Sequence, residues 1–141
     1  MLLDKYVMNS HDCSDIPLTD QAFAFVRQIA EGGPAFLTTH LPERFVVGTV
    51  AGAGLVERDR FIQAALGRAD LVAEHGLVAP ALERVDVTEL GAAYAMLTAH
   101  WSMNVPTGRL DLVEDLLVDR PGADWMCVAY LLRQDLPGLV V

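Results

Sequence analysis

The pattern of hydrophobic and polar positions divides this chain into a helical first half and a strand-rich second half. The segment Thr19–Glu31 has apolar residues at the i, i+3, i+4, i+7 spacing of an amphipathic helix, and a glycine pair ends it. Pro34 is suited to open a second, short helix that runs through Leu41, because a proline at the first helical position loses no hydrogen bond. The run Phe45–Val50 is β-branched and aromatic and predicts a strand.

Glycines then interrupt the pattern. Gly52 and Gly54 predict a tight turn after the first strand, and a third helix is expected over Val56–Leu66, continuing past Gly67. Alternation of apolar and polar residues over Leu82–Leu90 predicts the next strand. From this point onward the chain is expected to form a sheet.

The last third of the chain contains three alternating apolar segments joined by turn-rich breaks. These segments are Ala92–Met103, Arg109–Asp119 and Trp125–Arg133, and they predict an antiparallel meander.

The two breaks in this meander set an expected register. A first break over Asn104–Gly108 pairs Thr98 with Glu114, and the second break pairs Glu114 with Tyr130. His100 lies on the same face as this polar row, which is otherwise made of Leu, Val and Met. A shift of one residue in either turn exchanges the two faces, so the register is a hypothesis.

This order of elements, with a tryptophan just after the last turn, resembles the nuclear transport factor 2-like superfamily and, within it, the SnoaL-like group. The resemblance covers about Leu18–Leu136. The segments that carry it are Thr19–Glu31, Val50–Leu66, Leu90–Leu97 and Asp124–Tyr130. None of these segments is a catalytic motif.

The resemblance implies an α+β fold shaped as a cone, in which a strongly bent antiparallel (mixed) sheet wraps around the N-terminal helices and leaves an internal pocket. Members of the superfamily are often dimers through the outer face of the sheet. Their roles extend from isomerases, dehydratases, cyclases and epoxide hydrolases to pure protein-association domains, so the fold does not choose a function.

Length and composition indicate one globular domain. With 141 residues, of which 52% are hydrophobic, the chain can bury a core; residues 1–17 are expected to form a flexible arm and residues 18–141 the single domain. The net charge of -9 disfavours binding to nucleic acid or to an anionic membrane surface. The start of the chain lacks the pattern of a secretory signal, which makes the cytoplasm the expected location.

Glu114 is the most suggestive candidate for chemistry. A carboxyl group on an apolar face loses hydration, which raises its pKa toward the range useful for a general base or acid. Tyr130 or His100 would donate a hydrogen bond to an oxyanion, and Thr98 would orient the carboxylate. The alternative is a satisfied cross-strand network without catalysis, or a Glu114 that sits in water at the rim.

The expected ligand is a small, largely apolar molecule, bound without a cofactor. No nucleotide-binding, metal-protease or nucleophile-elbow motif occurs in the sequence. The apolar lining of the pocket is expected to consist of Phe25, Phe36, Phe61, Met96, Leu112 and Val128. If the protein is an enzyme, the resemblance favours proton transfer of the isomerase, dehydratase or cyclase type. The rival interpretation is a non-catalytic association or accessory domain whose cone is filled by its own side chains.

Two further expectations concern the surface and the arm. Trp101, Trp125 and Leu117 are expected on the outer face of the sheet, where they would form the interface of a homodimer. His11 and Cys13 have metal-ligand side chains in close order, but no second cluster completes a site, so a polar arm without metal is expected.

Overall fold

The computed structural model describes residues 16–120 and 124–134. Three helices and six strands follow one another along the chain: α1 (Leu18–Glu31), α2 (Gly33–His40), β1 (Arg44–Thr49), β2 (Gly52–Glu57), α3 (Arg58–Glu74), β3 (Ala81–Leu90), β4 (Tyr94–Val105), β5 (Gly108–Asp119) and β6 (Met126–Leu132). The expected helical first half and strand-rich second half are confirmed.

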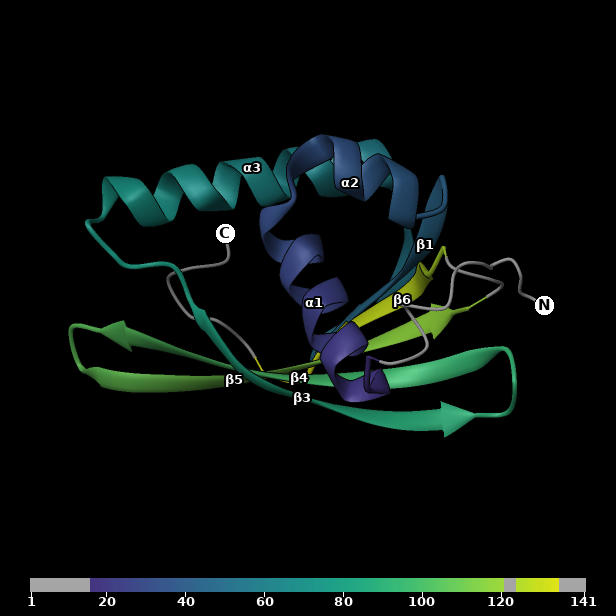
Figure 1. Cartoon of the computed structure of the whole chain (residues 1–141). Helices are drawn as coiled ribbons and strands as arrows, with labels where there is room; N and C mark the ends of the chain where they lie inside the picture. Colours follow the sequence, from purple (N-terminus) through teal and green to yellow (C-terminus); the bar gives the residue numbers. More distant parts are fainter. Residues whose placement is uncertain (1–15, 121–123, 135–141) are drawn as a thin grey trace.

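The strands form one curved, mixed sheet with the order β2-β1-β6-β5-β4-β3. Strand β1 runs parallel to β6, and all other neighbours are antiparallel. The three helices lie on one side of this sheet, with α1 crossing β3 and β4 and with α3 set further from the strands (Figure 1). We call the face beneath the helices the inner face and the opposite one the outer face. This architecture confirms the expected α+β class.

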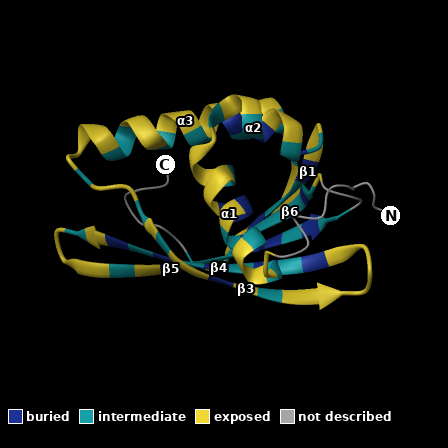
Figure 2. Ribbon diagram, in the orientation of Figure 1, coloured by how far each residue is buried: buried dark blue, intermediate teal, exposed yellow. Residues whose placement is uncertain are grey.

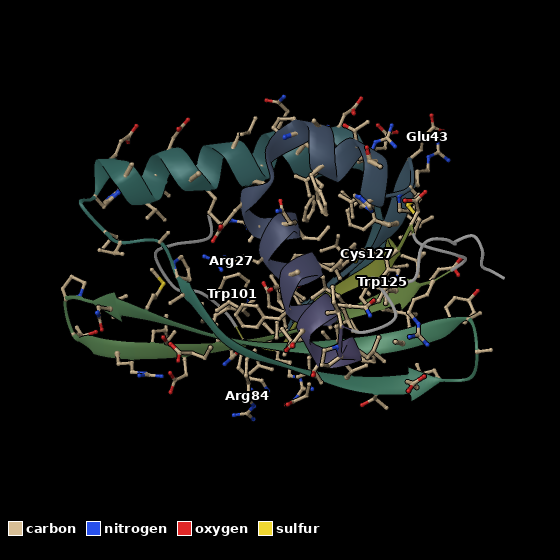
Figure 3. All side chains as sticks on the ribbon, viewed as in Figure 1. Arg27, Glu43, Arg84, Trp101, Trp125 and Cys127 are labelled. Atoms are coloured by element: carbon tan, nitrogen blue, oxygen red, sulfur yellow. The ribbon has the colours of Figure 1, made fainter. Side chains whose placement is uncertain are left out.

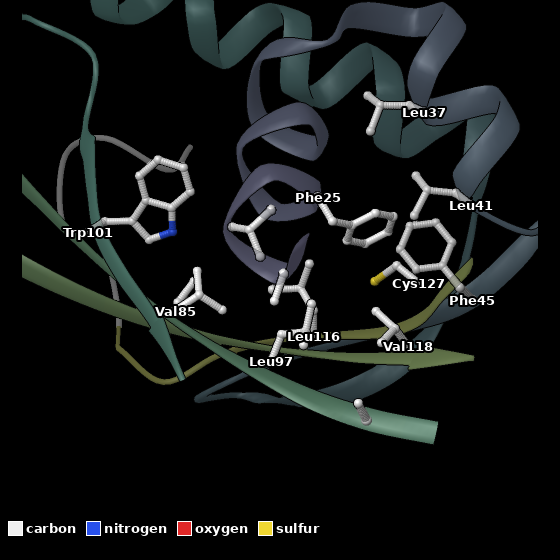
Figure 4. Packing of buried hydrophobic residues seen from close by; sticks show 14 of the residues in the cluster. Phe25, Leu37, Leu41, Phe45, Val85, Leu97, Trp101, Leu116, Val118 and Cys127 are labelled. Atoms are coloured by element: carbon white, nitrogen blue, oxygen red, sulfur yellow. The ribbon is translucent and has the colours of Figure 1, made fainter. Parts of the chain in front are cut away.

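The core fills the space between the helices and the inner face. Helix α1 buries Ala22, Phe25 and Val26, the i, i+3 and i+4 positions of its apolar stripe, against the strands. The buried residues follow the middle of β4 and β5 and the undersides of the helices (Figure 2). In Figure 4 the side chains of Phe25, Phe45, Leu97, Leu116 and Val118 converge in this space. Their burial supplies the main favourable term for folding.

The structure corrects the expected turn at Gly52 and Gly54. These glycines lie inside β2, which pairs with β1 in a hairpin, and the turn itself is the preceding Val50–Ala51 pair. Gly52 has a φ of +138°, a conformation suited to glycine that lets the hairpin close in two residues. The sequence Gly-Ala-Gly has little strand propensity of its own, so pairing with β1 decides its conformation.

The register of β4 and β5 also differs from the expected one. Only Pro106 and Thr107 form the turn, so that Val105 pairs with Gly108 and every later pair is displaced by one residue. The expected break, Asn104–Gly108, has five residues, so the hairpin would be symmetric about its middle residue, Pro106. The observed turn has two residues, so the hairpin is symmetric about the bond between Pro106 and Thr107, and the pairing shifts by one residue. As a result Ala99, not Thr98, pairs with Glu114.

The pairing of β5 with β6 is displaced by two residues, which preserves the faces near Tyr130. Glu114 pairs with Leu132 and Leu116 with Tyr130, so the Tyr130 side chain stays on the same face as Glu114. A bulge then places Val128 opposite no single residue of β5, since Leu117 pairs with Ala129 and Val118 with Cys127. Glu114 and Tyr130 are therefore diagonal neighbours across the two strands.

The register predicts that truncating two adjacent residues of β4 lowers the free energy of unfolding by very different amounts. Leu97 on the inner face is fully buried, whereas Met96 on the outer face is half-buried. Replacing Leu97 by Ala should lower the free energy of unfolding by about 3 kcal/mol, because it removes buried methyl groups and leaves a cavity. Met96→Ala should cost about 1 kcal/mol or less. Urea unfolding of both variants measures the difference, and equal costs would contradict this register.

Candidate functional site

A cavity of about 300 Å³ lies between the C-terminal half of α1, the inner side of α3 and the inner face of the sheet. Its size falls at the lower end of the range of small-molecule sites. Most of its wall is apolar. The lining side chains that matter below are those of Phe61, Ala65, Arg68, Trp101, Leu112, Glu114 and Tyr130.

The Glu114 carboxylate is held by two aromatic side chains at the sheet end of the cavity. The indole Nε1 of Trp101 donates to Oε1 at 2.9 Å, and the hydroxyl of Tyr130 donates to Oε2. Trp101 stands on the helix side of the sheet, as Figures 3 and 4 show, and is only 8% exposed. Phe61 packs edge-on against the Tyr130 ring. The carboxylate is thereby fixed in position among apolar groups.

Burial changes the protonation of these groups. Loss of hydration raises the pKa of Glu114 above its ordinary value of 4.5, against the opposing effects of the Tyr130 and Trp101 hydrogen bonds and the charge of Arg68. Burial and the neighbouring Glu114 raise the pKa of Tyr130 well above its ordinary value of 10.0. Glu114 therefore holds a proton more strongly than an exposed carboxyl does, which suits a group that exchanges protons.

The structure brings four of the expected site residues together. Glu114, Tyr130, Phe61 and Leu112 all line the cavity. The expected partners Phe25 and Phe36 instead pack in an aromatic group with His40 and Trp125 in the core, outside the cavity wall. Val128 occupies the bulge of β6 and does not line the cavity either.

The expected placement of Thr98, His100 and Met96 in the pocket is wrong. These three residues alternate on β4 with Leu97, Ala99 and Trp101, and the two-residue turn directs them to the outer face. Thr98 and Tyr130 were both expected to bind the Glu114 carboxylate, but they bind two different carboxylates. Tyr130 binds Glu114, and the hydroxyl of Thr98 donates to Asp115 at 2.8 Å.

The outer face carries its own polar network. Arg133 binds Asp115 through Nε and Nη2 at 2.7 and 2.9 Å, and these hydrogen bonds lower the pKa of Asp115 despite its burial. His100 Nε2 lies 2.9 Å from Asp86, whose carboxylate also contacts Arg84. Arg84 points away from the helices in Figure 3. The imidazole of His100 therefore has its partner outside the cavity, and the residue of β4 that binds Glu114 inside the cavity is Trp101.

Trp101, Arg68 and Glu31 are polar residues of the cavity wall that the sequence pattern did not identify as site residues. A signal for Trp101 exists in β4, where the odd positions Ala95 to Met103 are apolar throughout and the even positions include Thr98, His100 and Ser102. That alternation alone assigns Trp101 to the core side. No comparable signal marks Arg68, because it lies on a helix of mixed polarity.

Residues 16–120 and 124–134 contain no group of three or more His, Cys, Asp or Glu side chains placed to hold a metal ion. His11 and Cys13, the weak metal candidates, lie outside the described residues. Over the same ranges, no helix is long and apolar enough to cross a bilayer.

Comparison with known proteins identifies the fold. No protein-family model and no curated protein matches this sequence. An NTF2-like protein from Cytophaga hutchinsonii is 10% identical and superposes with a TM-score of 0.56, covering 82% of this chain and 93% of its own. An NTF2-like protein of unknown function in nutrient uptake from Rhodospirillum rubrum is 15% identical, with a TM-score of 0.57 and coverages of 83% and 98%.

A protein of unknown function with a cystatin-like fold, from Nostoc punctiforme, is also similar, at 13% identity and a TM-score of 0.56 over 86% of this chain and 92% of that one. These likenesses confirm the expected nuclear transport factor 2-like fold. At such low identities they show the fold alone, and the SnoaL-like group within it stays an expectation.

The raised pKa of Glu114 predicts a pH dependence of stability. Since the native state holds this proton more strongly than the unfolded chain, the contribution of Glu114 is fully present below about pH 4.5 and is lost as pH rises through the native pKa. The free energy of unfolding of the wild type, minus that of Glu114→Gln, should therefore fall as pH rises from 4.5. Urea unfolding across pH 4 to 8 measures this difference.

The neighbouring carboxylate supplies a control of opposite sign. Because the pKa of Asp115 is lowered from 3.8, its contribution is present above that pH and is lost as pH falls through the lowered value. The difference between wild type and Asp115→Asn should therefore shrink only in acid. A Glu114 difference that stays flat or grows with pH would contradict the assignment of a desolvated carboxyl.

Proposed function

We propose that this protein binds a small, largely apolar molecule in its cavity and transfers a proton on it without a cofactor, with Glu114 as the proton acceptor and donor. The observation that carries this proposal is a carboxyl group placed in a mostly apolar cavity and held by Trp101 and Tyr130. Such a group has a raised pKa and a fixed direction, two properties that general acid–base catalysis requires.

The chemistry favoured is isomerisation or dehydration of a carbonyl or hydroxyl compound. Glu114 takes a proton from a carbon beside the functional group and returns it elsewhere on the molecule, or to the departing hydroxyl. Trp101 and Tyr130 stabilise the carboxylate form through their hydrogen bonds and hold it in one orientation. His100 has no part in this proposal, since it is bonded to Asp86 on the outer face.

The rival proposal is a non-catalytic association domain. A filled cone, or a Glu114 at a wet rim, would favour it. The cavity of about 300 Å³, with Glu114 in its wall, supports the ligand-binding proposal instead. The cytoplasmic location stays a prediction of the sequence.

Hydrogen exchange on a ketone tests the proton-transfer proposal. The wild type should accelerate the exchange of the C2 protons of 1-tetralone in deuterium oxide, followed by proton NMR, because this bicyclic ketone is apolar and fits a small cavity. Glu114→Gln should lower the rate by about 100-fold or more, the usual contribution of a general base.

Asp115→Asn is the matched control, since it changes the adjacent carboxylate on the opposite face and should keep the wild-type rate. Circular dichroism checks that both variants are folded. Unchanged exchange in Glu114→Gln would remove Glu114 as the base. No acceleration by the wild type over a set of apolar ketones and aldehydes would favour the association domain.

The homodimer through the outer face also remains a proposal, with a corrected set of residues. Trp101 is on the inner face and Trp125 packs against Phe25, so Leu117 alone of the three expected residues lies on the outer face. Half-buried Val113 and Leu131 share that face with it, and no described helix covers them (Figure 1). These side chains form an apolar centre among charged neighbours.

Leu117→Lys should convert the dimer to a monomer, because it places a charge at the centre of this surface. Sedimentation velocity at high micromolar concentration measures the change. Val78→Lys, which alters an exposed apolar residue in the connection between α3 and β3, is the control and should remain dimeric. A monomeric wild type would contradict the proposal.

A further inference from the structure

Arg68 is the charged member of an otherwise apolar stripe on α3. The residues of this helix that line the cavity are Phe61, Ala65, Arg68, Ala69 and Val72. Their spacing follows one side of a helix, so the guanidinium belongs to the face that is turned toward the cavity. Arg68 is half-buried, unlike Arg60 on the same helix, which is exposed and does not line the cavity.

Within the described part of the chain, the Arg68 guanidinium has no ion pair and no side-chain hydrogen bond. Two carboxylates share the cavity wall with it, and both are engaged elsewhere. Glu31 lies 3.5 Å from Arg27 on α1, and Glu114 accepts its hydrogen bonds from Trp101 and Tyr130. Arg68 nevertheless acts on Glu114 and Tyr130 through its charge, which places it within electrostatic reach of the proposed reaction centre.

Arg68 is the one cation among the described residues that line the cavity, so the cavity favours a ligand with one negative charge. The planar fork of arginine matches a carboxylate with two parallel hydrogen bonds, and these are stronger in a site with little water. A dianion is disfavoured, because its second charge would lie near Glu31 and Glu114, and the described residues of the cavity wall supply no second cation. The chain as a whole repels anions with its net charge of -9, so an anionic ligand depends on this local cation.

We infer that the ligand is a small apolar monocarboxylate, whose carboxylate pairs with Arg68 and whose apolar body lies between Trp101, Leu112 and the Glu114 end of the cavity. This inference rests on the proposed ligand-binding function and names the substrate class of the same site. Arg68 then fixes the ligand at one end, so that the carbon from which Glu114 takes a proton is presented at the other end.

Binding of an isosteric pair of probes tests the inference. Calorimetric titration at constant ionic strength compares 2-naphthoate with its neutral counterpart 2-naphthamide. The wild type should bind the carboxylate about tenfold more tightly or better, a preference in the range of charge-assisted hydrogen bonds. Arg68→Gln should remove that preference while it still binds the amide, and Arg68→Lys should retain part of it.

Two controls separate this inference from the cavity proposal itself. Arg60→Gln removes an arginine from the same helix outside the cavity and should keep the full preference. Ala65→Phe fills the cavity and should abolish binding of both probes.

If Arg68→Gln keeps the preference, or if Arg60→Gln loses it equally, the role of Arg68 is overturned while binding in the cavity stands. If the wild type binds neither probe, the ligand class is overturned; the ketone exchange experiment then decides separately whether the cavity carries out proton transfer.

Discussion

The two-residue turn at Pro106 and Thr107 sets the chemistry of both faces of the sheet. Side chains alternate along a strand, so the point at which β4 turns into β5 decides which residues of the two strands share a face. With this turn, Trp101 reaches Glu114 and His100 is left on the outer face. A turn longer by one residue would place an imidazole beside Glu114 in place of the indole, and the cavity would hold a different set of proton donors.

Glu114 and Asp115 lie on opposite faces of one strand, and the two environments shift their pKa values in opposite directions. They are adjacent in sequence, yet loss of hydration raises the pKa of the first and the Arg133 hydrogen bonds lower that of the second. The inner carboxyl meets neutral donors in an apolar cavity, and the outer one meets a guanidinium near solvent. Proximity in the chain therefore says little about the charge that each group carries in the fold.

The cavity combines the desolvated carboxyl of Glu114 at the sheet with the guanidinium of Arg68 on α3, which has no ion pair among the residues that the structure describes. Neither group follows from the fold as such, because a fold does not by itself fix a function. The geometry around Glu114 and the position of Arg68 carry the proposed function, while the solved structures of similar shape support the architecture alone.

Local patterns along the chain predicted the class of the fold and most of its elements, because helical and alternating periodicities are local properties of the sequence. It also placed Glu114 and Tyr130 on one face, since their displacement by two residues preserves the alternation. Three features depend on tertiary contacts. Pairing with β1 makes the glycine-rich segment a strand, β2, and packing brings Arg68 of α3 to the cavity. The two-residue turn between β4 and β5 places Trp101 on the inner face, where Thr98 and His100 were expected. Each depends on contacts between residues far apart in the chain or on turn geometry, which periodicity does not encode.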